Sequence, residues 1–409
     1  MLKKIRVEDL RLGMHIHEFC GSWMEHPFWR TNFVIDDPED IRRVVESGIH
    51  ELWIDVAKGA DVETDLAGRP ATSVAEVEAE VSVALNAAAE APEAPARVSM
   101  AEEIKRAARV CARSRQLVVS MFQEARMGKA IDAEAAGELV EEISSSVLRN
   151  PGALISLARL KDADDYTYMH SVAVCALMVA LSRQLGLDEQ ETRKAGMAGL
   201  MHDLGKALTP PEVLNKPGKL TDAEFAIMKQ HPVEGHRLLL EAGKACDVTL
   251  DVCLHHHEKM DGTGYPDRLP AEQITLFARM GAVCDVYDAV TSNRPYKAGW
   301  DPAESIRKMA EWCNGHFDER VFQAFVRSVG IYPVGSFVRL ESGRLGVVVE
   351  QTEKSLLTPR VKVFFSAKAQ AHIAPEIVDL ARPGTMDKIA GREDPAKWGI
   401  KDVDRYWAA

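Results

Sequence analysis

The segment that organises this chain spans residues 255–266 and reads His255-His256-His257-Glu258-Lys259-Met260-Asp261-Gly262-Thr263-Gly264-Tyr265-Pro266. A structural core rarely combines adjacent imidazoles, two carboxylates, a glycine pair and a Tyr-Pro. Neighbouring histidines on a helix point about 100° apart, because one turn takes about 3.6 residues. One metal ion is therefore served poorly by both, whereas two adjacent ions could take one each. The glycines and the proline cannot continue a helix. The segment thus predicts a helix end that delivers metal ligands, followed by a loop beside the site.

The regions around this segment predict a mainly α protein with two small flanking parts. Apolar residues recur at three- and four-residue spacing from about residue 100 to residue 330, which indicates a helical domain. Within it we expect helices over 132–149 and from residue 150, and a buried central helix over 172–187. The expected parts are an α+β domain at 1–58, an Ala/Glu/Pro-rich linker at 59–99 with a fraying helix at 73–90, the helical domain at 100–330, a small antiparallel β unit at 331–382 and a loosely ordered polar tail at 383–409.

Composition excludes several classes of protein. The net charge of −12 argues against a general basic face for long nucleic acid. No run of about eighteen apolar residues occurs, so no membrane span is expected. No apolar secretory segment follows the basic N-terminus, and the seven cysteines are scattered without CxxC pairing. We therefore expect reduced thiols in a cytoplasmic protein.

The helical domain carries a set of candidate metal ligands. Each alone is more often an ordinary polar residue at a helix edge, but several are flanked by apolar residues and buried polar groups need partners. A metal is the simplest partner that all of them could share, and ligands without thiolates suit Mn, Fe, Mg or Zn. The carboxylate of the His-Asp pair can bridge two metals, as hydrolytic dinuclear sites require. The candidates are His170, His202, Asp203, His231, His256, His257 and Asp285.

Three basic residues lie near these candidates in the sequence. Lys206 follows His202 by four residues, so helical geometry could place both on one face; the alternative is a solvated helix end. Arg294 and Lys297 are three residues apart and follow Asp285. They could clamp a phosphate group, or form an ordinary surface pair.

Together these residues resemble the HD-GYP family, a branch of the HD phosphohydrolases that degrades cyclic di-GMP in bacteria. The resemblance covers about residues 140–330. The family pattern HD…HP…HHExxDGxGYP is present as His202-Asp203, His231-Pro232 and residues 256–266, and its spacing leaves His255 outside. Residues 1–58 are similar to the N-terminal domain of unknown function often attached to such proteins, with residues 21–30 as the recognisable part.

The resemblance implies an HD-type helical bundle and a role for each matching residue. The seven candidates above would be the metal ligands, with Asp203 bridging. Lys206 would contact the scissile phosphate. The dinucleotide would be held by Tyr265, Arg294 and Lys297, in a pocket shaped by Gly264 and Pro266. Some members carry a Glu four residues before the first His and bind three metals; here that position is Tyr166, so we expect two, Fe or Mn before Mg or Zn.

The activity implied is hydrolysis of cyclic di-GMP to linear pGpG, with GMP as a further product. Two other interpretations stay open. One is an HD hydrolase of another guanine nucleotide, such as a guanosine polyphosphate. The other is a non-catalytic module that binds cyclic di-GMP or docks onto a diguanylate cyclase of the GGDEF type. A homodimer is a further expectation.

Overall fold

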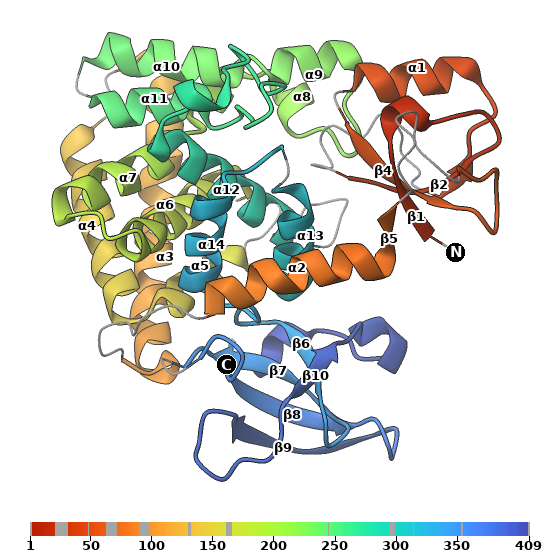
Figure 1. Ribbon diagram of the computed structural model, residues 1–409. Helices are drawn as coiled ribbons and strands as arrows, with labels where there is room; N and C mark the ends of the chain where they lie inside the picture. Colours follow the sequence, from red (N-terminus) through yellow and green to blue (C-terminus); the bar gives the residue numbers. More distant parts are fainter. Residues whose placement is uncertain are drawn as a thin grey trace. The chain divides into compact units, whose positions relative to one another are not determined.

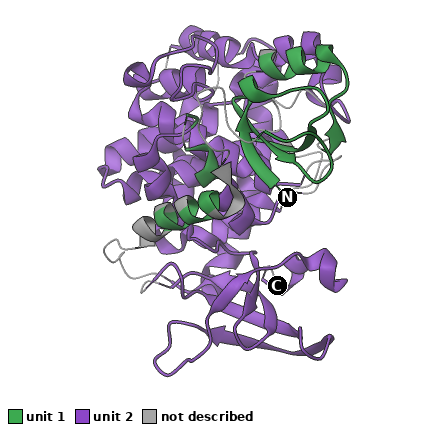
Figure 2. Cartoon of the chain, turned by 45° about the vertical axis from the view of Figure 1, so that its right-hand side comes forward, with its two compact units in different colours: residues 1–86, 309–316 green, residues 87–308, 317–409 purple. Residues whose placement is uncertain are grey.

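The computed structural model describes residues 2–20, 32–47, 49–62, 72–89, 98–129, 132–160, 166–243, 245–293, 299–313, 315–352 and 355–407. The chain divides into two compact units, residues 1–86 with 309–316, and residues 87–308 with 317–409 (Figure 2). The predicted fold class is confirmed: the protein is mainly helical, with a small antiparallel sheet toward each end of the chain (Figure 1).

The first unit is an antiparallel sheet with two helices, and its strand order is β3-β2-β4-β1-β5. Ile16, Leu52 and Ile54 are fully buried in its core. Helix α1 begins at Pro38, where the Asp37 carboxylate caps it by accepting a hydrogen bond from the Glu39 amide at 2.8 Å. The elements are β1 (Leu2–Arg6), β2 (His15–Phe19), β3 (Phe33–Val34), α1 (Pro38–Glu46), β4 (Glu51–Asp55), β5 (Thr72–Ser73) and α2 (Val74–Ala89).

The predicted linker contains more structure than its composition indicates. Strand β5 pairs with β1. Helix α2 buries Val77 and Val81 against Trp53 of β4. The predicted domain boundaries stay predictions about which parts fold independently.

The second unit is built around α6, whose residues 172–179 are almost completely buried, as expected for a central helix. Its helices are α3 (Met100–Arg126), α4 (Ala133–Arg149), α5 (Pro151–Arg159), α6 (Tyr166–Gln184), α7 (Glu189–Met201), α8 (Pro211–Leu214), α9 (Asp222–Met228), α10 (His231–Ala242), α11 (Asp247–His255), α12 (Leu276–Thr291) and α14 (Glu319–Val329). Helix α13 (Pro302–Trp312) begins in this unit.

Two glycines let α7 approach α6 closely. A methyl group on Gly199 would lie 3.0 Å from the backbone of Cys175, and one on Gly196 would lie 2.8 Å from a methyl group of Val140 and 2.9 Å from one of Val179. Side chains at these positions would therefore push the two helices apart. This close packing fixes the end of α7, where the His-Asp pair begins, relative to α6.

The second sheet has the strand order β10-β6-β7-β8-β9 and packs against the helices through Phe337, Val347 and Phe364. Its strands are β6 (Phe337–Leu340), β7 (Arg344–Glu350), β8 (Arg360–Ser366), β9 (Ala371–Asp379) and β10 (Ile389–Arg392). Strand β9 is largely exposed, so its sequence lacks the alternation that marks a strand.

The expectation of a loosely ordered tail from residue 383 was wrong. Strand β10 pairs with β6, and Trp407 is only 3% exposed. The Tyr406 ring stacks on Phe364 with centroids 3.6 Å apart. A few apolar side chains anchor the tail. The average composition of the tail is polar, so composition alone did not predict this anchoring.

No described helix is long and apolar enough to cross a membrane. All seven cysteines are free thiols, as the sequence predicts. Cys175, Cys253 and Cys284 are fully buried among the helices of the second unit.

A buried ion pair joins α3 to α4. The Glu103 carboxylate is inaccessible to solvent and accepts hydrogen bonds from Arg149 at 2.7 and 2.8 Å and from Ser146 at 2.9 Å. Burial by itself would raise the pKa of Glu103, but these bonds outweigh it and lower the pKa from 4.5. The pair therefore stabilises the fold above about pH 4.5, and this contribution is lost as the pH falls below that value.

We predict that Glu103→Gln lowers the free energy of unfolding by about 3 kcal/mol at neutral pH, because Arg149 loses its buried partner. Urea unfolding from pH 7 to pH 3 measures this, and the difference from wild type should shrink below about pH 4.5. The matched control is Glu138→Gln, which breaks an exposed pair with Arg113 between the same helices and should cost less than about 1 kcal/mol. Equal effects of the two variants would contradict the prediction.

Candidate metal centre

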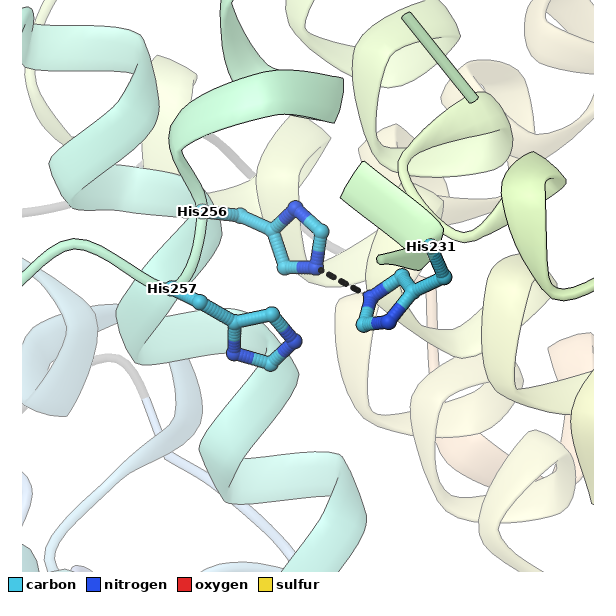
Figure 3. A group of neighbouring side chains, drawn as sticks. All are labelled: His231, His256 and His257. Atoms are coloured by element: carbon cyan, nitrogen blue, oxygen red, sulfur yellow. Dashed lines mark hydrogen bonds between the residues drawn. The ribbon is translucent and has the colours of Figure 1, made fainter. Parts of the chain in front are cut away.

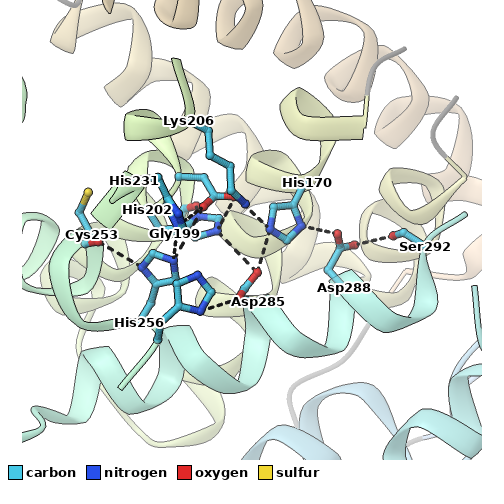
Figure 4. A network of polar contacts seen from close by, with 12 residues as sticks. His170, Gly199, His202, Lys206, His231, Cys253, His256, Asp285, Asp288 and Ser292 are labelled. Atoms are coloured by element: carbon cyan, nitrogen blue, oxygen red, sulfur yellow. Dashed lines mark hydrogen bonds and ion pairs between the residues drawn. The ribbon is translucent and has the colours of Figure 1, made fainter. Parts of the chain in front are cut away.

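The seven predicted ligands come from five places in the chain and meet in one buried cluster (Figure 4). Helix α6 carries His170, and the His202-Asp203 pair directly follows α7. His231 is the first residue of α10, and His256 and His257 directly follow α11. Asp285 lies midway along α12. Six of the seven are at most 3% exposed, and His257 is partly buried. The structure therefore brings together every residue that the sequence proposed as a ligand.

One half of the cluster gathers around His170, His202 and Asp285. His170 Nε2 lies 2.9 Å from Asp285 Oδ1, and His202 Nε2 lies 3.9 Å from the same oxygen. Both ring nitrogens lie 3.4 Å from Oδ2 of Asp203. Two imidazoles and two carboxylates thus converge on one position.

The other half gathers around His231, His256 and His257 (Figure 3). Oδ1 of Asp203 lies 3.2 Å from His231 Nε2 and 3.8 Å from His256 Nε2. The two oxygens of Asp203 therefore face different halves, which is the arrangement that a bridging carboxylate needs. His256 and His257 were expected to serve one ion each; the structure instead groups both with His231, and His256 also lies near His202.

The cluster has donor atoms that the protein leaves unpaired. Four buried atoms of the cluster have no hydrogen-bond partner within the described part of the chain: Nε2 of His202 and of His257, and one carboxylate oxygen each of Asp203 and Asp285. Such groups are costly unless something else binds them. Imidazole nitrogens and carboxylate oxygens suit divalent first-row metals, so the residues fit the metal ions that the sequence predicts.

Burial and charge set the protonation states that metal binding needs. Burial, assisted by His202 and His231, lowers the pKa of His256 to about 3. Burial likewise lowers the pKa of His257 and of His231. For Asp203, burial would raise the pKa, but His202 and Lys206 outweigh it and hold the pKa well below its usual range. The neutral imidazoles of the second half of the cluster and the ionised Asp203 are forms that bind cations.

Outer hydrogen bonds orient the ligand imidazoles. Nδ1 of His202 donates to the Gly199 carbonyl at 2.8 Å, and Nδ1 of His231 donates to the Met228 carbonyl at 2.7 Å. Because a carbonyl only accepts, Nδ1 carries the hydrogen and Nε2 is left facing the cluster. Such outer partners fix the ring and tune a metal ligand.

His170 is oriented by a carboxylate rather than by a carbonyl. Its Nδ1 lies 2.7 Å from Asp288, whose other oxygen accepts a hydrogen bond from Ser292 at 3.2 Å. Burial alone would lower the pKa of His170, but Asp285 and Asp288 raise it. The sequence did not predict a role for Asp288. Its spacing, one helical turn beyond Asp285, was the available signal.

Lys206 lies at the edge of the cluster, and its Nζ is 2.6 Å from Oδ2 of Asp203. Its side chain is 17% exposed, so the ammonium group borders both the buried carboxylate and solvent. The alternative of a fully solvated helix end is therefore wrong.

The Gly-Tyr-Pro loop packs directly on the ligand-bearing segment. A methyl group on Gly264 would lie 2.4–2.6 Å from backbone atoms of residues 257–259, so only glycine fits. The Tyr265 amide donates to the His257 carbonyl at 3.2 Å, and the two rings stack with centroids 4.6 Å apart. The role of Gly264 in this structure is close packing, and its predicted contact with substrate stays a prediction, as does that of Pro266.

Glu258 anchors residues 267–269, which directly follow the same loop. The sequence did not predict this role. Its buried carboxylate accepts hydrogen bonds from the amides of Asp267, Arg268 and Leu269 at 2.7–3.1 Å. A charged residue directly after a buried ligand was the signal for it.

Several predicted residues lie outside the cluster or outside the described residues. His255 contacts Asp251 at 2.8 Å and Asp267 at 3.2 Å and is not part of the cluster, as its position outside the family pattern indicates. Arg294 and Lys297 lie outside the described residues, as does the 21–30 stretch. Helix α6 begins at Tyr166, and the side chain of Tyr166 lies outside the part of the structure that is described.

Comparison with known proteins agrees with this geometry. Residues 148–321 match the HD domain, and residues 2–136 match a domain of unknown function. A cyclic di-GMP phosphodiesterase of Pseudomonas aeruginosa is 56% identical over the whole chain and 96% of its own length. This chain belongs to the HD-GYP family.

Two further relatives match less than half of this chain. A cyclic di-GMP phosphodiesterase response regulator of Xanthomonas campestris is 40% identical over 42% of this chain and 47% of its own. A 3′3′-cGAMP-specific phosphodiesterase of Vibrio cholerae is 35% identical over 46% of this chain and 42% of its own.

We predict that Asp288→Asn weakens metal binding about 10- to 100-fold, because His170 loses the charged partner that orients it. Isothermal titration calorimetry of metal-free protein with Mn(II) measures the affinity. The matched control is Asp251→Asn, which alters a similar His-Asp pair at His255, outside the cluster, and should leave the affinity unchanged. Wild-type affinity in Asp288→Asn would show that the pair does not support the site.

Proposed function

We propose that this protein is a metal-dependent phosphodiesterase that hydrolyses cyclic di-GMP, giving linear pGpG first and GMP as a further product. The observation that carries the proposal is the position of Asp203. Its two buried oxygens face two separate groups of imidazoles, the arrangement expected for a carboxylate shared by two metal ions. The Pseudomonas relative, named for this activity and similar over the full chain, supports the choice of substrate.

Two metal positions follow from the donor sets. The first would be held by His170, His202, Asp203 and Asp285, and the second by Asp203, His231, His256 and His257. Ligands without thiolates favour Fe or Mn, with Mg or Zn as alternatives. Divalent ions held in this way supply Lewis acidity toward phosphoryl oxygens and lower the pKa of water. A third ion is not proposed, because Tyr166 offers no carboxylate.

The chain's own residues have separable tasks in this proposal. Asp203 is kept ionised by His202 and Lys206 despite its burial, so it can hold cations on both sides. Lys206, at the solvent-facing edge of the cluster, is placed to stabilise negative charge that develops on a phosphoryl oxygen. Tyr265, Arg294 and Lys297 would bind the dinucleotide, with Gly264 and Pro266 shaping that side of the pocket.

Other substrates and partners define the alternatives. The 3′3′-cGAMP-specific relative makes that dinucleotide the first competitor to test, and a guanosine polyphosphate the second. A diguanylate cyclase partner and a homodimer remain predictions, and light scattering of the purified protein tests the homodimer.

The proposal is tested by reconstituting metal-free protein with Fe(II), Mn(II), Mg(II) or Zn(II) and separating the products of each substrate by chromatography. We expect turnover of cyclic di-GMP to pGpG with Fe or Mn. Asp203→Asn should lose both bound metal and activity while retaining its helical circular dichroism. Full turnover in metal-loaded Asp203→Asn protein would exclude the bridging role.

A second variant separates charge stabilisation from metal binding. Lys206→Met should keep wild-type metal content but lose about 10²- to 10³-fold in kcat, the usual cost of removing one such group. Lys105→Met, at an exposed position on α3, is the control and should leave kcat unchanged. Binding of cyclic di-GMP without hydrolysis under every metal would instead support the non-catalytic interpretation.

A further inference from the structure

One lysine outside the family pattern lies beside the substrate-facing loop. Lys229 follows α9, and its amide donates to the Phe225 carbonyl at 2.9 Å. Its ammonium group lies 4.6 Å from the centre of the Phe225 ring and 5.2 Å from the centre of the Tyr265 ring. Both distances are within the range of a cation–π interaction, about 6 Å. Lys229 therefore links α9 to the Gly-Tyr-Pro loop.

The Tyr265 ring is contacted by two groups that have different roles. The His257 imidazole stacks on it with planes inclined by 22°, and the Lys229 ammonium lies over it. The Tyr265 amide is also bonded to the His257 carbonyl. The stacking and the amide bond tie the tyrosine to a candidate metal ligand, and the lysine contacts the tyrosine from outside the segment that carries that ligand.

The segment that presents Lys229 also presents His231. The Met228 carbonyl accepts the hydrogen of His231 Nδ1 at 2.7 Å, so the backbone just before Lys229 orients this imidazole. One short stretch, residues 225–231, thus reaches the second half of the cluster through His231 and the loop through Lys229. Its geometry fixes the tyrosine relative to the metal positions.

We propose that Lys229 is a positioning residue that holds the Tyr265 ring against His257, in the orientation in which the tyrosine meets the phosphodiester of a cyclic dinucleotide. The inference rests on the proposed function for its substrate. It predicts that Lys229 affects substrate binding rather than metal binding, because its ammonium group contacts the Tyr265 ring on the loop that would face the substrate. It also predicts that any effect of Lys229 passes through Tyr265.

The kinetic test uses metal-loaded protein and cyclic di-GMP. Lys229→Met should raise KM about 2- to 30-fold with little change in kcat and with wild-type metal content, from the range of cation–π strengths. Lys229→Arg keeps a cation and should recover most of the loss. In a Tyr265→Leu background, Lys229→Met should add no further loss, because coupled residues are not additive. Additive losses, or an arginine variant as weak as the methionine variant, would overturn the inference.

A second measurement reads the positioning without turnover. Hydrogen exchange of the peptide over residues 257–266 reports the Tyr265 amide bond to His257. We expect faster exchange in Lys229→Met than in wild type, with protection restored in Lys229→Arg, and no change in the Lys105→Met control. Unchanged protection in Lys229→Met would overturn the inference. Absence of turnover in every wild-type metal form would instead count against the proposed function and leave this measurement valid.

Discussion

The structure of the second unit depends on one buried carboxylate. Asp203 is inaccessible to solvent, yet its two oxygens lie 3.2–3.4 Å from imidazoles that arrive on three different elements. An isolated carboxylate in this position would take up a proton, because burial disfavours its charge. Here neighbouring positive charge keeps it ionised. The helices can pack around Asp203 only because each brings a group that compensates for that buried charge.

Features of the backbone, more than side chains, bring these compensating groups to Asp203. Gly196 and Gly199 let α7 settle on α6, which sets the distance between His170 and the His-Asp pair. The same Gly199 offers its carbonyl to His202, so one residue provides both the close approach and the orientation. Helix ends provide the other carbonyls, since Nδ1 of His231 donates to the Met228 carbonyl at the end of α9, and Nδ1 of His256 contacts the Val252 and Cys253 carbonyls in the last turn of α11.

The sequence predicted the chemistry of the site better than its spatial detail. The seven candidate ligands could be proposed because several of them are flanked by apolar residues and buried polar groups need partners, and because they match the family pattern. The grouping of His256 with His257 could not be predicted, because it depends on the position of α10, which local periodicity does not determine. The hydrogen bond between His170 and Asp288 joins α6 to α12; the spacing of Asp288 from Asp285 indicates a shared helix face but not this partner. The ordered tail was missed because a few buried residues, Trp407 among them, outweigh a polar average.

The metal cluster and the substrate-facing loop are coupled through His257. This residue is a candidate ligand, its carbonyl accepts the Tyr265 amide, and its ring stacks on the tyrosine. The loop and a candidate ligand are therefore linked by one backbone hydrogen bond and one ring contact. The absence of room for a side chain at Gly264 makes the coupling rigid, because the loop cannot shift without disturbing residues 257–259. The histidine run and the Gly-Tyr-Pro loop therefore act as one structural element. Binding of a dinucleotide at the tyrosine would accordingly affect the surroundings of the metal positions through His257.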